Sequence, residues 1–483
     1  MKRFKAGDIE LLEIGECKWE IPKSQDMQVP GVVYADEDML EKISEDRSLY
    51  QVINVASLPG IVKASIAMPD IHWGYGMPVG GIAAFPFNED GIVGPGMVGY
   101  DINCGVRVHS TNLTVNEIKD KIEKISQKLY DMVPAGVGIG GNVKLDKRKM
   151  EKFSTEGVRY AVELGYGSFE DVKSVESEGC VEGANFDYVS QKAYDRGRDQ
   201  LGTLGSGNHF VEIGYVEEIY MENIAKEWGF EKGMVTVLIH SGSRGFGHQI
   251  CDDYLKEFSK WCAKNNIKLK DRQLVWSFLN TQESKRYLAA MNCAINYAFV
   301  NRFIIAHFVK EALKSSLGKN IEMKLLYDVA HNTAKIEEHT VNGKKEKLLV
   351  HRKGATRAFP KDNPLLPEKH KKFGQPVIIP GDMGRYSYVL LGTEKAMEET
   401  WGTVCHGAGR VLSRSKAIKM AKGRNIQREL QEVGITVKAR ETELLAEEMS
   451  EAYKDVSQVV DVCEKAGVSL KVLRLKPLAV IKG

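Results

Sequence analysis

Four histidines stand in glycine- or asparagine-rich contexts typical of active-site loops, although the 483 residues include only 11 histidines. An imidazole can bind a divalent metal ion, transfer a proton or act as a nucleophile. A single histidine in such a context is more often a hydrogen-bonded structural residue than a functional one. Four in similar contexts indicate a shared site, and they are His209 in Gly-Asn-His-Phe, His240 in Ile-His-Ser-Gly, His331 in Ala-His-Asn and His406 in Cys-His-Gly-Ala-Gly.

A fifth motif, Gly-Tyr-Asp-Ile-Asn-Cys-Gly, contains Asp101 and Cys104. A tight turn over these residues would let the carboxylate and the thiolate face one point. Sulfur, imidazole and carboxylate together suit a borderline divalent ion such as manganese or zinc, and a thiolate can bridge two ions. The alternative is that Cys104 is a buried small apolar residue and that Asp101 only stabilises the turn. We interpret Asp101, Cys104, His209, His240 and His331 as candidate metal ligands.

Three glycine-rich loops could bring backbone N–H groups close to a phosphate, at residues 204–208, 380–384 and 406–409. We expect the last of these to lead into a helix over residues 411–430, whose N-terminus would add a favourable dipole. Such loops are more often simple turns. None of the three matches the Walker pattern or the dinucleotide-binding pattern.

Basic residues cluster locally although the chain is nearly neutral, with 67 Lys and Arg against 65 Asp and Glu. Arg410 and Arg414 would lie one turn apart on the expected helix and could hold successive phosphates. Lys353 belongs to a second basic, loop-like cluster at residues 351–357. A solvated basic helix face is the alternative, and we treat the three residues as candidate contacts to a polyanion.

Short apolar strands and amphipathic helices must position these residues. Apolar runs at 235–239, 325–330 and 377–379 predict strands that end at His240, His331 and the 380–384 loop. Thr114 and Glu117 form a capping box before an apolar stripe, and further helices are predicted over 283–313, 440–453 and 457–466. We expect a mixed α/β (α+β) fold with one catalytic domain over residues 1–483, and surface insertions near 140–155 and 338–348.

The composition excludes several classes of protein. The eight cysteines are scattered without a Cys-x-x-Cys pair, which argues against a zinc ribbon or a disulfide framework and favours a reducing compartment. The N-terminus lacks the apolar core of a signal peptide. The apolar stretch 291–309 is interrupted by Asn, Arg and His, so we expect no membrane span. These features predict a cytoplasmic protein.

Taken together, the motifs resemble those of the RtcB family of tRNA-splicing RNA ligases. The similarity rests on Asp-Ile-Asn-Cys-Gly, Gly-Ser-Gly-Asn-His-Phe-Val-Glu, His-Ser-Gly-Ser-Arg-Gly, Ala-His-Asn, Arg-Lys-Gly-Ala-Thr-Arg-Ala and Cys-His-Gly-Ala-Gly-Arg, and it runs in order from residue 68 to residue 483. The resemblance implies a ligase that joins a 2′,3′-cyclic phosphate or 3′-phosphate RNA end to a 5′-hydroxyl end, with GTP and two Mn²⁺ ions. It also implies sheets that converge on a central dinuclear metal site.

The resemblance further implies a role for each motif. Asp101, Cys104 and His209 would hold one ion, and Cys104 would bridge to a second ion held by His240 and His331. His406 would attack the α-phosphate of GTP and carry GMP. Tyr453 would stack on guanine and Lys482 would contact it. The nucleotide contacts would be Asn208, His209, Phe210, Val211, Glu212, His331, Asn332, Pro380, Gly381, Asp382, Met383, Ser387, His406, Gly407, Ala408, Gly409, Tyr453 and Lys482.

The implied partners are RNA (tRNA halves or broken RNA) and GTP, with archease as a candidate activating protein; we expect a monomer. Two other classes of function stay open from the residues. A dinuclear metallo-phosphoesterase would need the metal cluster but not a guanine pocket. A non-catalytic RNA-binding protein would need the basic patch but not the ligand set. A lysine-nucleophile ligase is disfavoured, because the chain has no Lys-x-Asp-Gly sequence.

Overall fold

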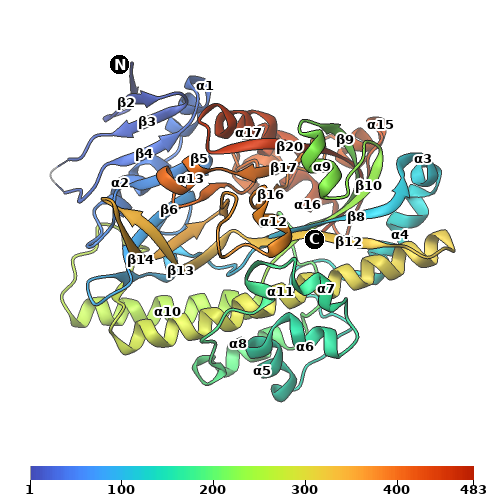
Figure 1. Ribbon diagram of the computed structural model, residues 1–483, viewed down its shortest axis with the longest axis horizontal. Coiled ribbons are helices and arrows are strands. Elements are labelled where there is room, and N and C mark those ends of the chain that lie inside the picture. The colour runs from blue at the N-terminus through green and yellow to red at the C-terminus, as the bar shows by residue number, and fades with distance from the viewer. Residues whose placement is uncertain (1, 25) are drawn as a thin grey trace.

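The computed structural model describes residues 2–24 and 26–483, and two mixed β-sheets form the centre of the fold (Figure 1). The first sheet has the order β1-β2-β3-β4-β5-β6-β14-β13, and only its β4–β5 pair is parallel. Its strands are β1 (Arg3–Ala6), β2 (Ile9–Gly15), β3 (Lys18–Ile21), β4 (Gly31–Tyr34), β5 (Ser65–His72), β6 (Val79–Pro86), β14 (Lys344–Lys353) and β13 (Asn332–Val341).

The second sheet has the order β12-β8-β10-β9-β20-β17-β16, and β19 pairs in parallel with β20. Its strands are β12 (Met323–Ala330), β8 (Gly105–Thr114), β10 (Met234–Ser241), β9 (Phe210–Ile219), β20 (Ser469–Lys482), β17 (Ser387–Gly392), β16 (Pro376–Ile379) and β19 (Thr436–Ala439). Two short ladders pair β15 (Ala355–Arg357) with β18 (Thr403–Cys405) and β7 (Ile92–Val93) with β11 (Ser277–Phe278).

The register of the second sheet brings distant segments to one edge. Gly105, at the start of β8, pairs with Ser241 at the end of β10 and with Ala330 at the end of β12. Phe210, at the start of β9, pairs with His240 and with Lys482 at the end of β20. Antiparallel pairing therefore places Cys104, His209, His240 and His331 at the same edge of the sheet.

Helices α10 (Arg244–Lys264) and α11 (Gln282–Leu317) run together beneath the sheets (Figure 1). Thr281 caps the start of α11 by accepting the N–H of Ser284, and Gly318 ends it in a left-handed conformation. This helix is long and apolar enough to cross a membrane, but 83% of its most apolar window is buried inside the protein. A core helix of that kind has apolar residues all round because every face is packed.

The remaining helices pack on the two sheets or on α10 and α11 (Figure 1). The first sheet packs against α1 (Glu37–Ser44), α2 (Ser48–Ala56) and α17 (Val456–Lys465). The second packs against α4 (Ile122–Met132), α9 (Glu222–Glu227), α14 (Arg414–Met420), α15 (Ile426–Glu432) and α16 (Thr442–Glu447). Short helices lie against α10 and α11, namely α5 (Lys147–Glu156), α6 (Val158–Glu163), α7 (Phe169–Val172) and α8 (Gln191–Gly197).

The mixed α/β class and most predicted elements are confirmed. The helices expected at 283–313 and 457–466 are α11 and α17, and the predicted strands are β10, β12 and β16. The capping box of Thr114 and Glu117 is present, although a short 3₁₀ turn divides the helix after it into α3 (Val115–Ile118) and α4. Both bonds of that box close the first turn, which the spacing alone predicts.

Two helix predictions are wrong. The segment 411–430 divides into α14 and α15, because Gly423 takes a positive φ of 83° and Ser413, not the glycine loop, caps α14. The segment 440–453 divides into α16 and a 3₁₀ turn at Ser450–Ala452. Its helix stops because Glu448 turns inward to form ion pairs, and such tertiary contacts outweigh local helix propensity.

The two segments that we expect to be insertions differ in how they pack. In residues 140–155, helix α5 buries Met150 and Phe153 against the cluster around α10 and α11 while its lysines stay in solvent. Residues 338–348 form the end of the β13–β14 hairpin, which is mostly exposed at its tip.

Candidate active site

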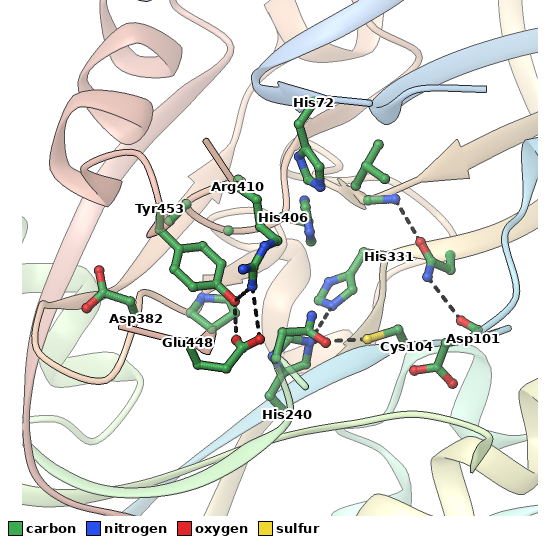
Figure 2. Close-up of a pocket in the computed structure, with 18 of the residues that line it drawn as sticks. His72, Asp101, Cys104, His240, His331, Asp382, His406, Arg410, Glu448 and Tyr453 are labelled. Carbon is green, nitrogen blue, oxygen red and sulfur yellow. Dashed lines mark hydrogen bonds and ion pairs between the residues drawn. The ribbon is translucent and has the colours of Figure 1, made fainter. Parts of the chain in front are cut away.

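A cavity of about 300 Å³ opens at the edge where the strand ends meet (Figure 2). His331 and His406 occupy its middle, with Asp101 and Cys104 on one side and Tyr453 and Asp382 on the other (Figure 2). Most of the residues predicted from sequence line it, namely Asp101, Cys104, Asn208, His240, His331, Asn332, Lys353, Pro380, Gly381, Asp382, Met383, His406, Gly407, Ala408, Gly409, Arg410, Arg414, Tyr453 and Lys482. Buried residues that are also predicted but do not line it are His209, Phe210, Val211, Glu212 and Ser387.

The turn that carries Asp101 and Cys104 is held by backbone and amide bonds. The N–H of Cys104 donates to the carbonyl of Asp101 over 2.9 Å, and Asn103 adopts a positive φ of 52°. The amide of Asn332 donates to the same carbonyl over 3.0 Å. The carboxylate and the thiol of this turn therefore face the strand ends of the second sheet, as the spacing predicts.

Five candidate ligand atoms gather around this turn, and those of Cys104, His209, His240 and His331 lie at distances close to those between ligands of one metal ion. Cys104 Sγ lies 3.4 Å from His209 Nε2 and 3.2 Å from His240 Nε2. His240 Nε2 lies 3.3 Å from His331 Nε2, and His209 Nε2 lies 2.9 Å from Asp101 Oδ2. Metal bonds of about 2.0–2.3 Å at tetrahedral angles separate ligand atoms by about 3.3–3.8 Å. Cys104, His209 and His240 thus form a buried group able to hold a divalent ion, with Asp101 and His331 flanking it.

The protonation states of this cluster suit a cation. Burial lowers the pKa of His209, and it lowers the pKa of His240 and His331 further, helped by the neighbouring imidazoles. Neutral imidazoles present a lone pair to a metal ion. Burial and then Asp101 raise the pKa of the Cys104 thiol well above its ordinary value. A divalent cation would reverse that effect on the thiol, so the donor set fits a metal ion better than it fits an empty core.

His209 is also oriented from behind. Its Nδ1 lies 3.1 Å from the carbonyl of Leu204 and 3.1 Å from a guanidinium nitrogen of Arg244. Nδ1 can donate to the carbonyl or accept from the guanidinium, and in the tautomer that donates to the carbonyl, Nε2 keeps the lone pair that faces Cys104. The guanidinium lies where a side chain on Gly205 would stand, so this glycine leaves room for Arg244.

His406 is fixed by a buried carboxylate. Asp70 Oδ2 accepts from His406 Nδ1 over 2.5 Å, from the His406 backbone N–H over 2.9 Å and from the Gly407 N–H over 3.3 Å. Burial would raise the pKa of Asp70, but its contacts with His406 hold it below the ordinary value. Lys454 donates to the carbonyls of Pro69 and Ile71 on both sides of Asp70. His406 therefore keeps its proton on Nδ1, and Nε2 is free to act as a nucleophile.

A network of charged residues closes the other end of the cavity. Tyr453 donates its hydroxyl to Glu448, and the guanidinium of Arg410 lies over the Tyr453 ring at 4.9 Å. Glu448 also pairs with Arg410 at 2.9 Å and with Lys482 at 3.5 Å. These contacts hold the Tyr453 ring and the Lys482 ammonium beside the cavity, where the resemblance expects the guanine base.

Two buried carboxyl groups at this end, those of Glu212 and Asp382, have one oxygen each without a hydrogen bond from a described residue. Glu212 Oε2 accepts from Ser387 over 3.5 Å, whereas Glu212 Oε1 has no hydrogen-bond donor among the described residues and Asp382 Oδ2 has only the guanidinium of Arg385 at 3.5 Å. Burial raises the pKa of Glu212 to about 8, and burial also raises the pKa of Asp382. Buried acceptors without donors suit a ligand that brings N–H groups, such as a purine edge.

The other predicted nucleotide contacts differ in whether their side chains reach the cavity. Asn208 is exposed at the cavity, whereas Val211 is fully buried in the core beneath β9. Phe210 is covered by the Lys482 ammonium, 5.4 Å from its ring. The side-chain amide of Asn332 donates to the carbonyl of Asp101 and accepts the N–H of Gly354, so both of its polar atoms already have partners.

The predicted phosphate contacts differ from the expected helical pair. Arg410 precedes α14 and is engaged by Glu448, whereas Arg414 is exposed, with its Nε 3.7 Å from Glu447. Lys353 donates to the carbonyls of Tyr75, Met77 and Gly96. Burial lowers its pKa to about 7, and because its amino group is engaged by three carbonyls, Lys353 holds a loop and does not face solvent. Only Arg414 keeps a solvent-facing guanidinium among the three.

Sequence reasoning missed several residues that shape the site. Glu448 stands in an ordinary charged stretch without any signal of its own. Arg302 lies in the middle of the apolar helix α11 and donates to the carbonyls of Asn103 and Ser241. A charged residue inside an otherwise apolar stretch was the available signal for Arg302, because buried charges need specific partners.

The site thus combines a candidate metal cluster with an oriented histidine, and comparison with known proteins assigns the chain to a family. A family model described as "tRNA-splicing ligase RtcB" matches residues 51–483. A curated protein of that name from Archaeoglobus fulgidus is 50% identical over 478 residues, 98% of this chain and 99% of its own length. Namesakes from Nanoarchaeum equitans (49%, over 99% and 100%) and Thermococcus kodakarensis (48%, over 98% and 99%) are similar. The chain belongs to the RtcB family, as the motifs predict.

Proposed function

We propose that the protein joins a 3′-phosphate RNA end to a 5′-hydroxyl RNA end through GMP carried on His406. The broader part, an RNA ligase of tRNA splicing, follows from family membership and from relatives of that name that align over nearly the whole chain. The geometry that supports the finer part is the bond between His406 Nδ1 and Asp70, because a proton held on Nδ1 leaves the lone pair on Nε2, beside the cavity, for nucleophilic attack.

The first step is transfer of GMP to His406. Nε2 attacks the α-phosphorus of GTP, a P–N bond forms, and the bond to the β-phosphate breaks to release pyrophosphate. The Nδ1 proton stays in its hydrogen bond to Asp70, which stabilises the positive charge that develops on the ring. Tyr453, Lys482 and the carboxyl groups of Glu212 and Asp382 would position the guanosine.

The second and third steps use the RNA ends. An oxygen of the RNA 3′-phosphate attacks the phosphorus on His406, the P–N bond breaks, and an RNA-ppG end forms. The 5′-hydroxyl then attacks the RNA phosphorus, and GMP leaves. A 2′,3′-cyclic phosphate must first be opened by water. Divalent ions held by Asp101, Cys104, His209, His240 and His331 would polarise the phosphoryl oxygens, and we propose Mn²⁺ for this role.

Incubation with α-³²P-GTP and Mn²⁺ followed by a denaturing gel tests the proposal. The native chain should retain a label that is acid-labile and alkali-stable, and His406→Ala should retain none. A native chain that binds GTP without becoming labelled would show that His406 is not a nucleophile. The same metal cluster would then support hydrolysis of a phosphoester instead.

A further inference from the structure

Three aromatic side chains in mutual contact form a partly exposed aromatic rim beside the cavity, and they are Tyr75, Tyr100 and His248. The Tyr100 ring stacks on the His248 ring at 4.7 Å and 27°. Tyr75 meets Tyr100 edge-on at 5.3 Å. His248 is exposed and the two tyrosines are half-buried. An aromatic ring that stays in contact with solvent lacks the stabilisation that burial would give. Rings of this kind at the border of a cavity are therefore candidate ligand contacts.

The aromatic rim lies on the side of the cavity opposite the proposed guanosine pocket. Tyr100 lines the cavity and directly precedes Asp101. Asp101 and Tyr453 stand on opposite sides of His331 and His406 (Figure 2). A nucleotide bound at Tyr453 with its α-phosphate at His406 would leave the Tyr100 side open. The second substrate must reach His406 from a side that the nucleotide does not fill.

The rim is rigid before any ligand arrives. Lys353 donates to the carbonyl of Tyr75 and to the carbonyls of Met77 and Gly96, which fixes the loop after β5. Gly76, with a φ of 75°, lies so close to the carbonyl of Gln273 that a side chain would not fit. His248 sits within the long helix α10. A preformed surface loses little conformational entropy when a ligand binds to it.

A positively charged side chain, Arg196, lies next to His248 of the aromatic rim. The exposed guanidinium of Arg196 lies 3.3 Å from His248 Nδ1 and 3.0 Å from the Gln249 side chain. The nearby carboxylate of Asp252 is paired with Lys256 at 2.7 Å. Rings followed by an available positive charge match the alternation of bases and phosphates along a single strand.

We propose that the aromatic rim seats unpaired nucleobases at the end of an RNA strand, with Arg196 contacting a phosphate of the same strand. The inference rests on the proposed ligase function and adds where the RNA is held. Stacking of this kind tolerates any base, because every base offers a π face. The rim therefore favours single-stranded ends of any sequence over ends that are closed in a duplex.

Photocrosslinking locates the RNA directly. One RNA carries 5-iodouridine next to a 3′-phosphate and a second carries it next to a 5′-hydroxyl, so the two arms distinguish the two ends. After irradiation without GTP, at least one RNA should crosslink to peptides that contain Tyr75, Tyr100 or His248. Crosslinks confined to other peptides, or none under conditions where RNA binding is measured, would overturn the proposal.

Variants of His248 distinguish the loss of base stacking from a general loss of structure. His248→Leu should weaken binding of a single-stranded RNA end about tenfold, whereas His248→Phe should bind within about twofold of the native chain. Phe169→Ala removes an exposed ring that does not line the cavity and should have no effect. Equal affinities for the Leu and Phe variants would contradict the inference.

Labelling of His406 by GTP separates this proposal from the ligase proposal. RNA binding and crosslinking need no GTP, so both can be measured on a chain that takes no label. His248→Leu should keep the native label, because His248 contacts neither the metal cluster nor Tyr453. A variant that loses label and RNA binding together would point to a damaged site and would overturn the stacking role.

Discussion

Arg302 and Asp328 form a fully buried ion pair at 2.7 Å, and this pair anchors the metal cluster from the core. The same guanidinium donates over 2.9 Å to the carbonyl of Asn103, next to Cys104, and over 2.9 Å to that of Ser241, next to His240. Arg107 binds the second oxygen of Asp328 over 2.8 Å. One side chain of α11 thus fixes two backbone segments that carry candidate ligands.

Arg302→Lys should lower metal affinity as well as stability. A lysine cannot reach both carbonyls and Asp328 at once, so unfolding should become easier by about 3 kcal/mol. Arg107→Lys is the matched control, because the Arg107 side chain shares Asp328 but, unlike that of Arg302, donates to neither the Asn103 nor the Ser241 carbonyl. Both variants should melt earlier, and only Arg302→Lys should bind Mn²⁺ at least tenfold more weakly by calorimetry. Equal metal affinities for the two variants would rule out the anchoring role.

Asp70→Asn should slow guanylylation without abolishing GTP binding. The amide oxygen can still accept the N–H groups of His406 and Gly407, but the negative charge that stabilises the imidazole ring is lost. The single-turnover labelling rate should fall about 100-fold or more. GTP affinity measured by calorimetry should stay within about twofold, since the described hydrogen bonds of Asp70 go to His406 and Gly407 and not to Tyr453 or Lys482. A native labelling rate would show that the Asp70 charge does not assist His406.

The sequence predicts the elements that carry their own local signal. Glycine contexts locate His240, His331 and the 380–384 loop at strand ends, because turns have strong sequence requirements. The spacing of Asp101 and Cys104 predicts one turn, which the Cys104 N–H closes. Thr114 and Glu117 mark a helix start for the same reason.

Tertiary contacts decide what the sequence leaves undetermined. The polar residues that interrupt the apolar stretch 291–309 argue against a membrane span, but nothing local says that Asn301 and Arg302 bond to the loops of the site. The charge-rich segment 440–453 has the propensity of one helix, yet ion pairs of Glu448 divide it. No motif identifies Glu448, because its ion-pair partners Lys482 and Arg410 lie 34 and 38 positions away in the chain.

Metal removal should destabilise the chain and should depend on Cys104. A cation held by the buried histidines and the thiol would stabilise the folded state, so chelation should lower the melting temperature by about 5 °C or more. Cys104→Ser should melt near the chelated native chain, and chelation should change its melting temperature little. If neither a chelator nor added Mn²⁺ changed the melting temperature of the native chain, a metal role for this cluster would be contradicted.

Glu212→Gln should make the chain more stable at alkaline pH. The pKa of Glu212 is raised to about 8 in the folded protein, above its ordinary value of 4.5. The folded state therefore binds more protons than the unfolded state between these values, and stability falls as pH rises through this window. The amide of glutamine does not titrate and removes that loss. The variant should melt about 2–5 °C above the native chain at pH 8.5, and the difference should vanish near pH 4.5. Ser387→Ala, which removes the bond to Oε2 but keeps the carboxyl group, should show no such gain, and a pH-independent difference for Glu212→Gln would refute the raised pKa.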